Sequence, residues 1–184
     1  MKKLLLSCTA LLMTVPYFTT TSYAEDVNVD NLENDTEWWT SVPGRIDPND
    51  SNLDLDSLPP SSAEIVLVED KLTRDKQTIA SGSGQTYLNR DGLYWDGTSA
   101  TSVDDVVASF SVVGTLYKKV KSTGKLDQLD QDNDTQWFGK GLVIAQTEGK
   151  TGVVGDVMIA EGIHSVNLGM VTDTVVTTEK YELK

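Results

Sequence analysis

Cysteine is nearly absent from this sequence, because Cys8, close to the start, is the one residue of its type. The rest of the chain therefore has no disulfide, no zinc–thiolate site and no cysteine nucleophile. Basic residues are also scarce: 15 Lys and Arg stand against 28 Asp and Glu, which gives a net charge of −13. A surface of this sign disfavours nucleic acids and anionic membranes as partners and suits a cationic one.

The first 24 residues have the features of a secretory signal peptide. Two lysines precede an apolar run, Leu4–Phe18, and the stretch Ser22–Ala24 resembles a cleavage site. The run is interrupted by Pro16 and is shorter than the roughly 20 apolar residues of a membrane-spanning helix. We therefore expect export through the Sec pathway, with cleavage after Ala24 and no insertion in the membrane.

Residues 25–35 form an acidic N-terminal extension whose apolar residues are Val27, Val29 and Leu32. From residue 36 to residue 184, short runs rich in β-branched and aromatic residues alternate with turn signals about every 8–12 residues. Asp91-Gly92 is typical of a hairpin turn, and no long stretch has apolar residues at helical spacing. The pattern predicts one all-β domain over 36–184, built as a β-sandwich.

The strongest strand signal is the stretch Val157–Val176. Within it Val166, Leu168 and Met170 occupy alternate positions, as expected for a strand with one face on a core. The group Ala160–Gly162 is typical of a turn before that strand. Three further local expectations are a strand over Thr36–Val42, a short strand at Leu53–Leu55, and a loop at Ser81–Gly84.

Carboxylates stand at alternate positions, Asp130, Asp132 and Asp134, of a polar connection between strands. A calcium loop of the EF-hand type has this spacing, but it also needs Gly at its sixth position and an acid at its twelfth. This sequence has Thr135 and Gly141 there. A solvated acidic loop is therefore favoured over a weak surface calcium site, and we predict no bound metal.

His164 is the only histidine of the chain. No serine has the G-x-S-x-G setting that would supply a nucleophile beside it, so we interpret it as an edge or half-buried strand residue. No other motif indicates an active site, and we predict a protein that is not an enzyme and has no cofactor. Trp38, Trp95 and Trp137 allow two interpretations, either a platform for a sugar or residues of the core.

The segment Glu161–Val171 resembles the late-strand pattern of bacterial chaperone–usher pilins, in which a glycine, a β-branched residue and a histidine or aromatic lead into an alternating strand. The start of the chain is similar in kind to common-pilus and related fimbrial major subunits. The corresponding features are a short arm, Val27–Leu32, a tryptophan-containing strand, Trp38–Ser41, and a Leu-x-Leu strand, Leu53–Leu55.

This resemblance implies an immunoglobulin-like sandwich that lacks one strand and is completed by a donor strand from the next subunit. The three apolar residues of the extension would be donor residues, and Val166, Leu168 and Met170 would belong to the acceptor core. The implied partners are copies of itself or other pilins, a periplasmic chaperone and an outer-membrane usher. The implied function is that of a structural subunit of a surface fimbria that contributes to adhesion. The alternative is a self-contained secreted β-sandwich that binds a carbohydrate or a protein.

Overall fold

The computed structural model describes residues 38–50, 52–70, 76–150 and 152–184, all within the compact unit Thr36–Lys184. Neighbouring strands in this part of the chain pair antiparallel, so the predicted all-β class is confirmed. Among the described residues, no helix has the length and apolar character that crossing a bilayer requires. The strands are β1 (Ser62–Asp70), β2 (Lys76–Asp91), β3 (Tyr94–Lys119), β4 (Leu126–Lys150), β5 (Val157–Asn167) and β6 (Thr172–Glu182).

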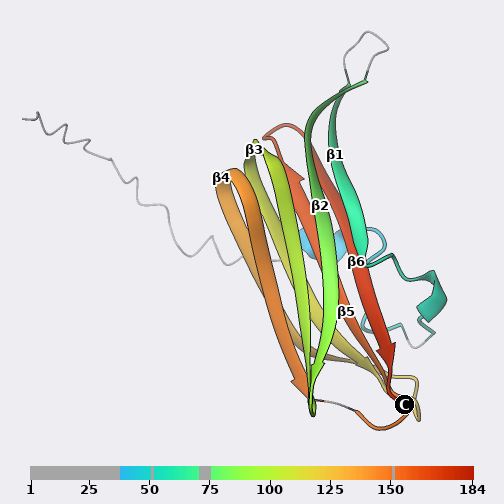
Figure 1. Cartoon of the computed structure of the whole chain (residues 1–184). Coiled ribbons are helices and arrows are strands. Elements are labelled where there is room, and N and C mark those ends of the chain that lie inside the picture. The colour runs from blue at the N-terminus through green and yellow to red at the C-terminus, as the bar shows by residue number, and fades with distance from the viewer. Residues whose placement is uncertain (1–37, 51, 71–75, 151) are drawn as a thin grey trace, which may run out of the picture. The chain divides into compact units, whose positions relative to one another are not determined.

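The long hairpin of β3 and β4 divides this sheet into two layers (Figure 1). Its ladder is interrupted between Val103 and Val107, where both strands bend. On its other side the first half of β3 pairs with β2 and the second half pairs with β5. One layer therefore contains β1, β2 and the first half of β3, and the other contains β5, β6 and the second half of β3. One half of β4 belongs to each layer.

The bend in β4 contains three unusual backbone conformations within four residues. Phe138 has a φ of 52° and is the only non-glycine residue with positive φ in the described part of the chain. Gly139 and Gly141 follow with φ values of 153° and 134°. Glycine adopts such angles without a side-chain clash, whereas an aromatic residue with positive φ is an outlier. The sequence Phe-Gly-Lys-Gly thus allows one strand to serve both layers.

The two layers approach each other at both outer edges, so that the sheet nearly closes into a barrel-like form. At the β1–β6 seam no ladder joins the two strands within the described residues. Two hydrogen bonds cross there: the Thr178 amide donates to the Pro60 carbonyl at 3.1 Å, and the Val66 amide donates to the Asp173 carboxylate at 3.2 Å. At the opposite edge the two halves of β4 lie side by side.

Apolar side chains fill the space between the layers in two clusters. The smaller cluster is built around Trp95, with Leu116, Met158 and Leu183. The larger cluster contains apolar residues of β1 to β5 that face the space between the layers. Its buried members are Ile65, Leu67, Ala80, Val103, Val107, Phe110, Val112, Val143, Ala145 and Val166.

Residues 38–50 and 52–58, here called the strap, cross the outer face of the β5–β6 layer. Trp39 packs there with Ile163 and Val176, and Ile46 packs with Tyr117 and Ile159. Lysine side chains of the sheet donate to strap carbonyls, including Lys119 to Leu53 at 2.6 Å. Because one face meets the other layer and one face meets the strap, β5 is buried at nine consecutive positions.

The two strands predicted within the strap are wrong. Residues 38–41 form a 3-10 turn, and Leu55–Ser57 form the 3-10 helix η2. A main-chain hydrogen bond from the Val42 amide to the Trp39 carbonyl at 3.3 Å, three residues back, closes the turn, while Trp39 is buried on the sheet and Trp38 stays 38% exposed. The helix begins where the Asp54 carboxylate accepts a hydrogen bond from the Asp56 amide.

Two predicted turns are also wrong, because their glycines permit close packing inside strands. Ser81–Gly84 lies within β2, and a Cβ atom on Gly84 would lie 2.4 Å from Cδ2 of His164. Ala160–Gly162 lies within β5, and a Cβ atom on Gly162 would lie 2.3 Å from Oγ1 of Thr86. Neither position tolerates a side chain without displacement of its neighbour.

The prediction that one strand continues through Met170 is wrong. Strand β5 ends at Asn167, and a tight turn follows in which the Leu168 amide donates to the Val171 carbonyl at 2.9 Å. Gly169 adopts a φ of 92° in this turn, and Met170 is fully exposed. The alternation Val166–Leu168–Met170 therefore spans a strand end and a turn, which sequence periodicity alone does not separate.

Candidate functional site

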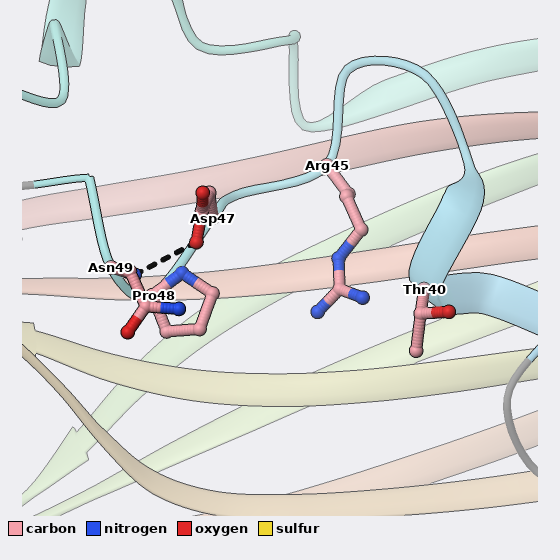
Figure 2. Close-up of a pocket in the computed structure, with 5 residues that line it drawn as sticks. All are labelled: Thr40, Arg45, Asp47, Pro48 and Asn49. Carbon is pink, nitrogen blue, oxygen red and sulfur yellow. Dashed lines mark hydrogen bonds between the residues drawn. The ribbon is translucent and has the colours of Figure 1, made fainter.

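A cavity of about 390 Å³ lies on the strap, lined by Thr40, Arg45, Asp47, Pro48 and Asn49. Figure 2 shows the Arg45 side chain between the Asp47–Asn49 turn on one side and Thr40 on the other. The local sequence sets this geometry. Gly44 has a φ of 84°, and the Asn49 amide donates to the Asp47 carboxylate at 2.8 Å, which fixes the turn after Arg45.

Arg45, which lines this cavity, also carries an unsatisfied donor. Its Nε is buried, and it is the one buried side-chain nitrogen or oxygen of the described residues that has no hydrogen-bond partner. An unpaired buried donor costs about 1–3 kcal/mol. Because this atom is closed off from solvent, a ligand in the cavity would contact other atoms of Arg45, whose side chain also interacts with the Tyr117 hydroxyl.

Beneath the strap, two buried polar side chains lie within reach of the Arg45 charge. Glu161 is 1% exposed, and its carboxylate accepts hydrogen bonds from the Ile46 amide and from the Tyr117 hydroxyl, the latter at 3.2 Å. This carboxylate holds the strap residue next to Arg45 in place. Because Glu161 and Tyr117 do not line the cavity, a ligand there would contact Arg45 directly and these two groups indirectly.

Burial dominates the protonation of this cluster. It raises the pKa of Glu161, against the lowering effects of the Ile46 amide, the Arg45 charge and the Tyr117 hydroxyl. Burial also raises the pKa of Tyr117, which the nearby Glu161 carboxylate raises further. The Tyr117 hydroxyl therefore stays protonated and acts as a donor to Glu161. The arrangement orients Arg45 and keeps both of these groups away from the cavity, where Asp47 is the exposed carboxylate.

A second polar group lies between the two layers, around His164. Its Nδ1 is 3.0 Å from Oγ1 of Thr101, and its Nε2 is 2.7 Å from Oγ1 of Thr177. Thr101 donates its own hydrogen to the Ser111 carbonyl at 2.9 Å, so Nδ1 carries the proton and Nε2 is the acceptor. Thr177 then lies 2.6 Å from Thr86. Burial lowers the pKa of His164 to about 4, which keeps the ring neutral near pH 7.

The interpretation of His164 as an edge or half-buried residue is wrong. The side chain is 0% exposed, and β5 pairs with β3 on one side and β6 on the other. Its partners are hydroxyl groups, and a general base without access to solvent or substrate has no function. The ring instead joins the two layers through a hydrogen-bonded network.

The three predicted ligand aromatics do not form one platform. Trp95 is 2% exposed in the core, where its ring packs 5.0 Å from that of Tyr181. Trp137 is 70% exposed at the bend of β4, and Trp38 is 38% exposed on the strap. The core interpretation therefore holds for Trp95. Trp38 alone shares the segment that carries the cavity, two residues before Thr40.

The residues predicted to belong to the donor and acceptor strands lie in different parts of the chain. Val27, Val29 and Leu32 lie outside the described residues, as does the whole of the predicted signal peptide. Val166 is buried between the layers, and Leu168 packs against the same cluster while remaining partly exposed. Met170 does not belong to that core, because it lies in the exposed turn after β5.

The alternating aspartates have a structural use in β4, which begins at Leu126 and so includes the predicted polar connection. The Asp130, Asp132 and Asp134 carboxylates accept hydrogen bonds from three main-chain amides of the other half of the strand. The distances are 2.9 Å to Glu148, 2.9 Å to Gln146 and 3.2 Å to Ile144. Within the described residues no three His, Cys, Asp or Glu side chains gather as a metal site.

Sequence reasoning missed the Arg45 cavity. The available signal was Arg45-Ile46 between two turn sequences, Pro43-Gly44 and Asp47-Pro48, in a segment otherwise poor in basic residues. A second signal was Glu161 within an apolar strand, since a buried carboxylate requires a partner. Comparison with protein-family models and with curated proteins gives no match to this sequence.

Proposed function

We propose that this protein is an exported, self-contained β-domain that binds a neutral, hydroxyl-rich ligand such as a saccharide unit in the strap cavity. The mixed lining of this cavity, with the donors of Arg45 and Asn49 beside the acceptors of Asp47 and Thr40, is the observation that carries the proposal. The proposed function is binding rather than catalysis, because Glu161 and Tyr117 are buried beneath the strap and the Asp47 carboxylate accepts a hydrogen bond from the Asn49 main-chain amide.

The lining residues favour a sugar over a charged ligand. The Arg45 guanidinium and the side-chain amide of Asn49 supply donors. The Asp47 carboxylate and the Thr40 hydroxyl supply acceptors. Vicinal hydroxyl groups donate and accept together, so they match such a mixed lining. A ligand carboxylate would approach Asp47 in a protein whose net charge is −13. Trp38 is the nearest exposed aromatic in sequence and is suited to stack on a sugar ring.

The capped strand edges support a domain that is complete by itself. The β4 edge has three of its amides bound by aspartates, and the β1–β6 seam is crossed by two hydrogen bonds. Free edges of this kind promote association with other chains, and side-chain acceptors reduce that tendency.

The test is a screen of mono- and oligosaccharides by calorimetry, followed by two variants of the cavity. Arg45→Lys keeps the charge but removes the guanidinium group, and Asn49→Ala removes the side-chain amide. We expect each to weaken binding about 10-fold or more, since a hydrogen bond to a charged group is worth about 1.5–3 kcal/mol. Arg90→Gln, which changes an exposed arginine over Trp95, is the matched control. Equal affinity in all three variants would show that the cavity is not the site.

A second candidate is the fimbrial subunit, an immunoglobulin-like sandwich completed by a donor strand, and the β1–β6 seam favours it. The seam lacks a ladder within the described residues, and Leu168, Val171 and Val175 pack beside it while remaining partly exposed. A strand from another copy would pair with these edges after the Val66–Asp173 hydrogen bond breaks.

Sedimentation of the chain from Glu25 onward separates the two candidates. A fimbrial subunit gives concentration-dependent polymers that disappear when Val27 and Val29 are replaced by Asp, because charged donor residues cannot enter an apolar groove. A self-contained domain gives a monomer with or without these substitutions. A stable monomer would therefore contradict the fimbrial candidate and leave the binding domain.

A further inference from the structure

The bend of the β3–β4 hairpin carries a group of exposed apolar side chains, here called the bend patch. Its members are Val106, Trp137, Phe138 and Leu142, which are 72%, 70%, 79% and 55% exposed. All four lie within two residues of the pairs Val103↔Gly141 and Val107↔Gly139, between which the ladder is interrupted. Two bulky aromatic residues at adjacent positions on a surface mark an interaction site rather than ordinary exposed carbon.

The backbone holds both aromatic rings outward. In a regular strand Trp137 and Phe138 would point to opposite faces, and one ring would enter the core. The φ of 52° at Phe138 breaks this alternation. Such a conformation is unfavourable for an aromatic residue, and its persistence at an exposed site is typical of a functional constraint.

The patch is bordered by acidic side chains. Asp104 and Asp105 precede Val106 and are exposed, and Asp134 lies on the same stretch of β4 as Trp137. Lys140 is the one basic residue between Phe138 and Leu142. An acidic border around an apolar centre suits a partner with apolar anchors and basic flanks.

We propose that the bend patch docks a protein segment in which apolar residues are flanked by Lys or Arg. The acidic border and the net charge of −13 oppose a second copy of this chain, an anionic membrane and a nucleic acid. The partner contacts side chains rather than adding a strand, because the β4 amides of Ile144, Gln146 and Glu148 are already bound by aspartates. The proposal rests on the proposed function only in taking the domain as complete by itself.

The test uses calorimetry with a short synthetic peptide of alternating Lys and Leu, and with its Glu–Leu counterpart. We expect the Lys–Leu peptide to bind and the Glu–Leu peptide not to bind. Trp137→Ser and Phe138→Asn should each weaken binding about tenfold or more, as for aromatic anchors at interfaces. Asn tolerates positive φ, so Phe138→Asn keeps the bend. Leu93→Ser changes an exposed leucine on the β2–β3 turn and should leave binding unchanged.

Several outcomes would overturn the proposal. One is equal binding of the Lys–Leu and Glu–Leu peptides, and another is a loss of peptide affinity in Leu93→Ser as large as in the patch variants. The others are self-association of the protein that depends on Phe138 and Phe138-dependent binding to vesicles of anionic or zwitterionic lipid. Arg45→Lys distinguishes this proposal from the proposed function. If both hold, that variant loses saccharide binding and keeps peptide binding, so either can fail while the other stands.

Discussion

At the scale of single residues, the interior is shaped by small side chains around His164. Gly84 and Gly162 leave the space that the imidazole occupies between the layers. The ring in turn joins Thr101 of β3 to Thr177 of β6. Glycine in a strand interior ordinarily weakens the strand. Here the glycines are explained by the imidazole ring, which approaches the backbone too closely for a larger residue.

Replacement of Gly84 by Ala should destabilise the fold by about 1–3 kcal/mol, because overpacking forces the neighbouring ring or strand to move. The new Cβ atom would lie 2.4 Å from Cδ2 of His164. Urea unfolding measures the change. Ser83→Ala, one position away and pointing outward, is the control and should change stability by less than about 0.5 kcal/mol. Equal effects of the two substitutions would contradict this account of the packing.

His164 should make the fold less stable as pH falls. Its pKa is lowered from 6.5 to about 4, so the unfolded chain binds a proton through this interval and the folded chain does not. The stability that the neutral His164 contributes to the fold is therefore fully present above pH 6.5 and is lost as the pH falls towards 4. At about 1.4 kcal/mol for each pKa unit, the loss is at most roughly 3.5 kcal/mol.

The neighbouring Glu161 acts in the opposite direction. Its pKa is raised, so the stability that it contributes is present at low pH and is lost as pH rises through its folded pKa. Urea midpoints of the natural protein and of His164→Gln, measured at pH 7 and pH 4.5, isolate the histidine. We expect a smaller decrease with pH in the variant, and an identical decrease would mean that His164 does not titrate between these values.

At the scale of elements, a clear turn sequence was the most reliable local signal. The Asp91-Gly92 turn between β2 and β3 was predictable for this reason. Prediction failed where glycine serves packing, as at Gly84 and Gly162, and where a strand is buried on both faces, as in β5. The strap was also mispredicted, because its aromatic residues owe their positions to the sheet beneath and not to local preference.

The hydrogen bonds from β4 main-chain amides to aspartate carboxylates stabilise the fold at the same scale. Asp132→Ala should cost about 0.5–1.5 kcal/mol, because the exposed Gln146 amide exchanges its carboxylate acceptor for water. Hydrogen exchange at Gln146 should also become faster. Asp132→Asn keeps a side-chain acceptor and should cost less. The control is Asp127→Ala, which removes an exposed ion pair with Lys125 that contributes little. Unchanged exchange at Gln146 in Asp132→Ala would contradict the role of the carboxylate.

At the scale of the whole molecule, charge opposes compactness. The net charge of −13 is offset locally by few ion pairs, and the described residues contain two, Lys125–Asp127 and Lys180–Asp56. Repulsion between carboxylates extends over about 10 Å at 0.1 M salt and is shorter at higher salt. The excess of negative charge was evident from the composition. The Arg45 cavity was not predictable from the sequence, because it depends on which strap residue lies above Glu161 in the fold.

The melting temperature should therefore rise when sodium chloride is increased from low to moderate concentration, because screening reduces repulsion in the folded state. The measurement is thermal unfolding followed by circular dichroism at pH 7. A variant with Asp47 and Asp50 of the strap replaced by Asn should show a smaller rise. A melting temperature that falls or stays constant with salt would contradict the dominance of repulsion.

The hydroxyl groups beside His164 can change their donor direction together. With neutral His164, Ser99 donates to Thr86, Thr86 to Thr177, and Thr177 to Nε2, over distances of 3.0, 2.6 and 2.7 Å. A proton added to Nε2 would reverse all three donors, and Ser99 would then donate to the Glu161 carbonyl at 3.4 Å. The chain thus has two complete proton arrangements, and an acid-charged imidazole would lose no hydrogen-bond partner.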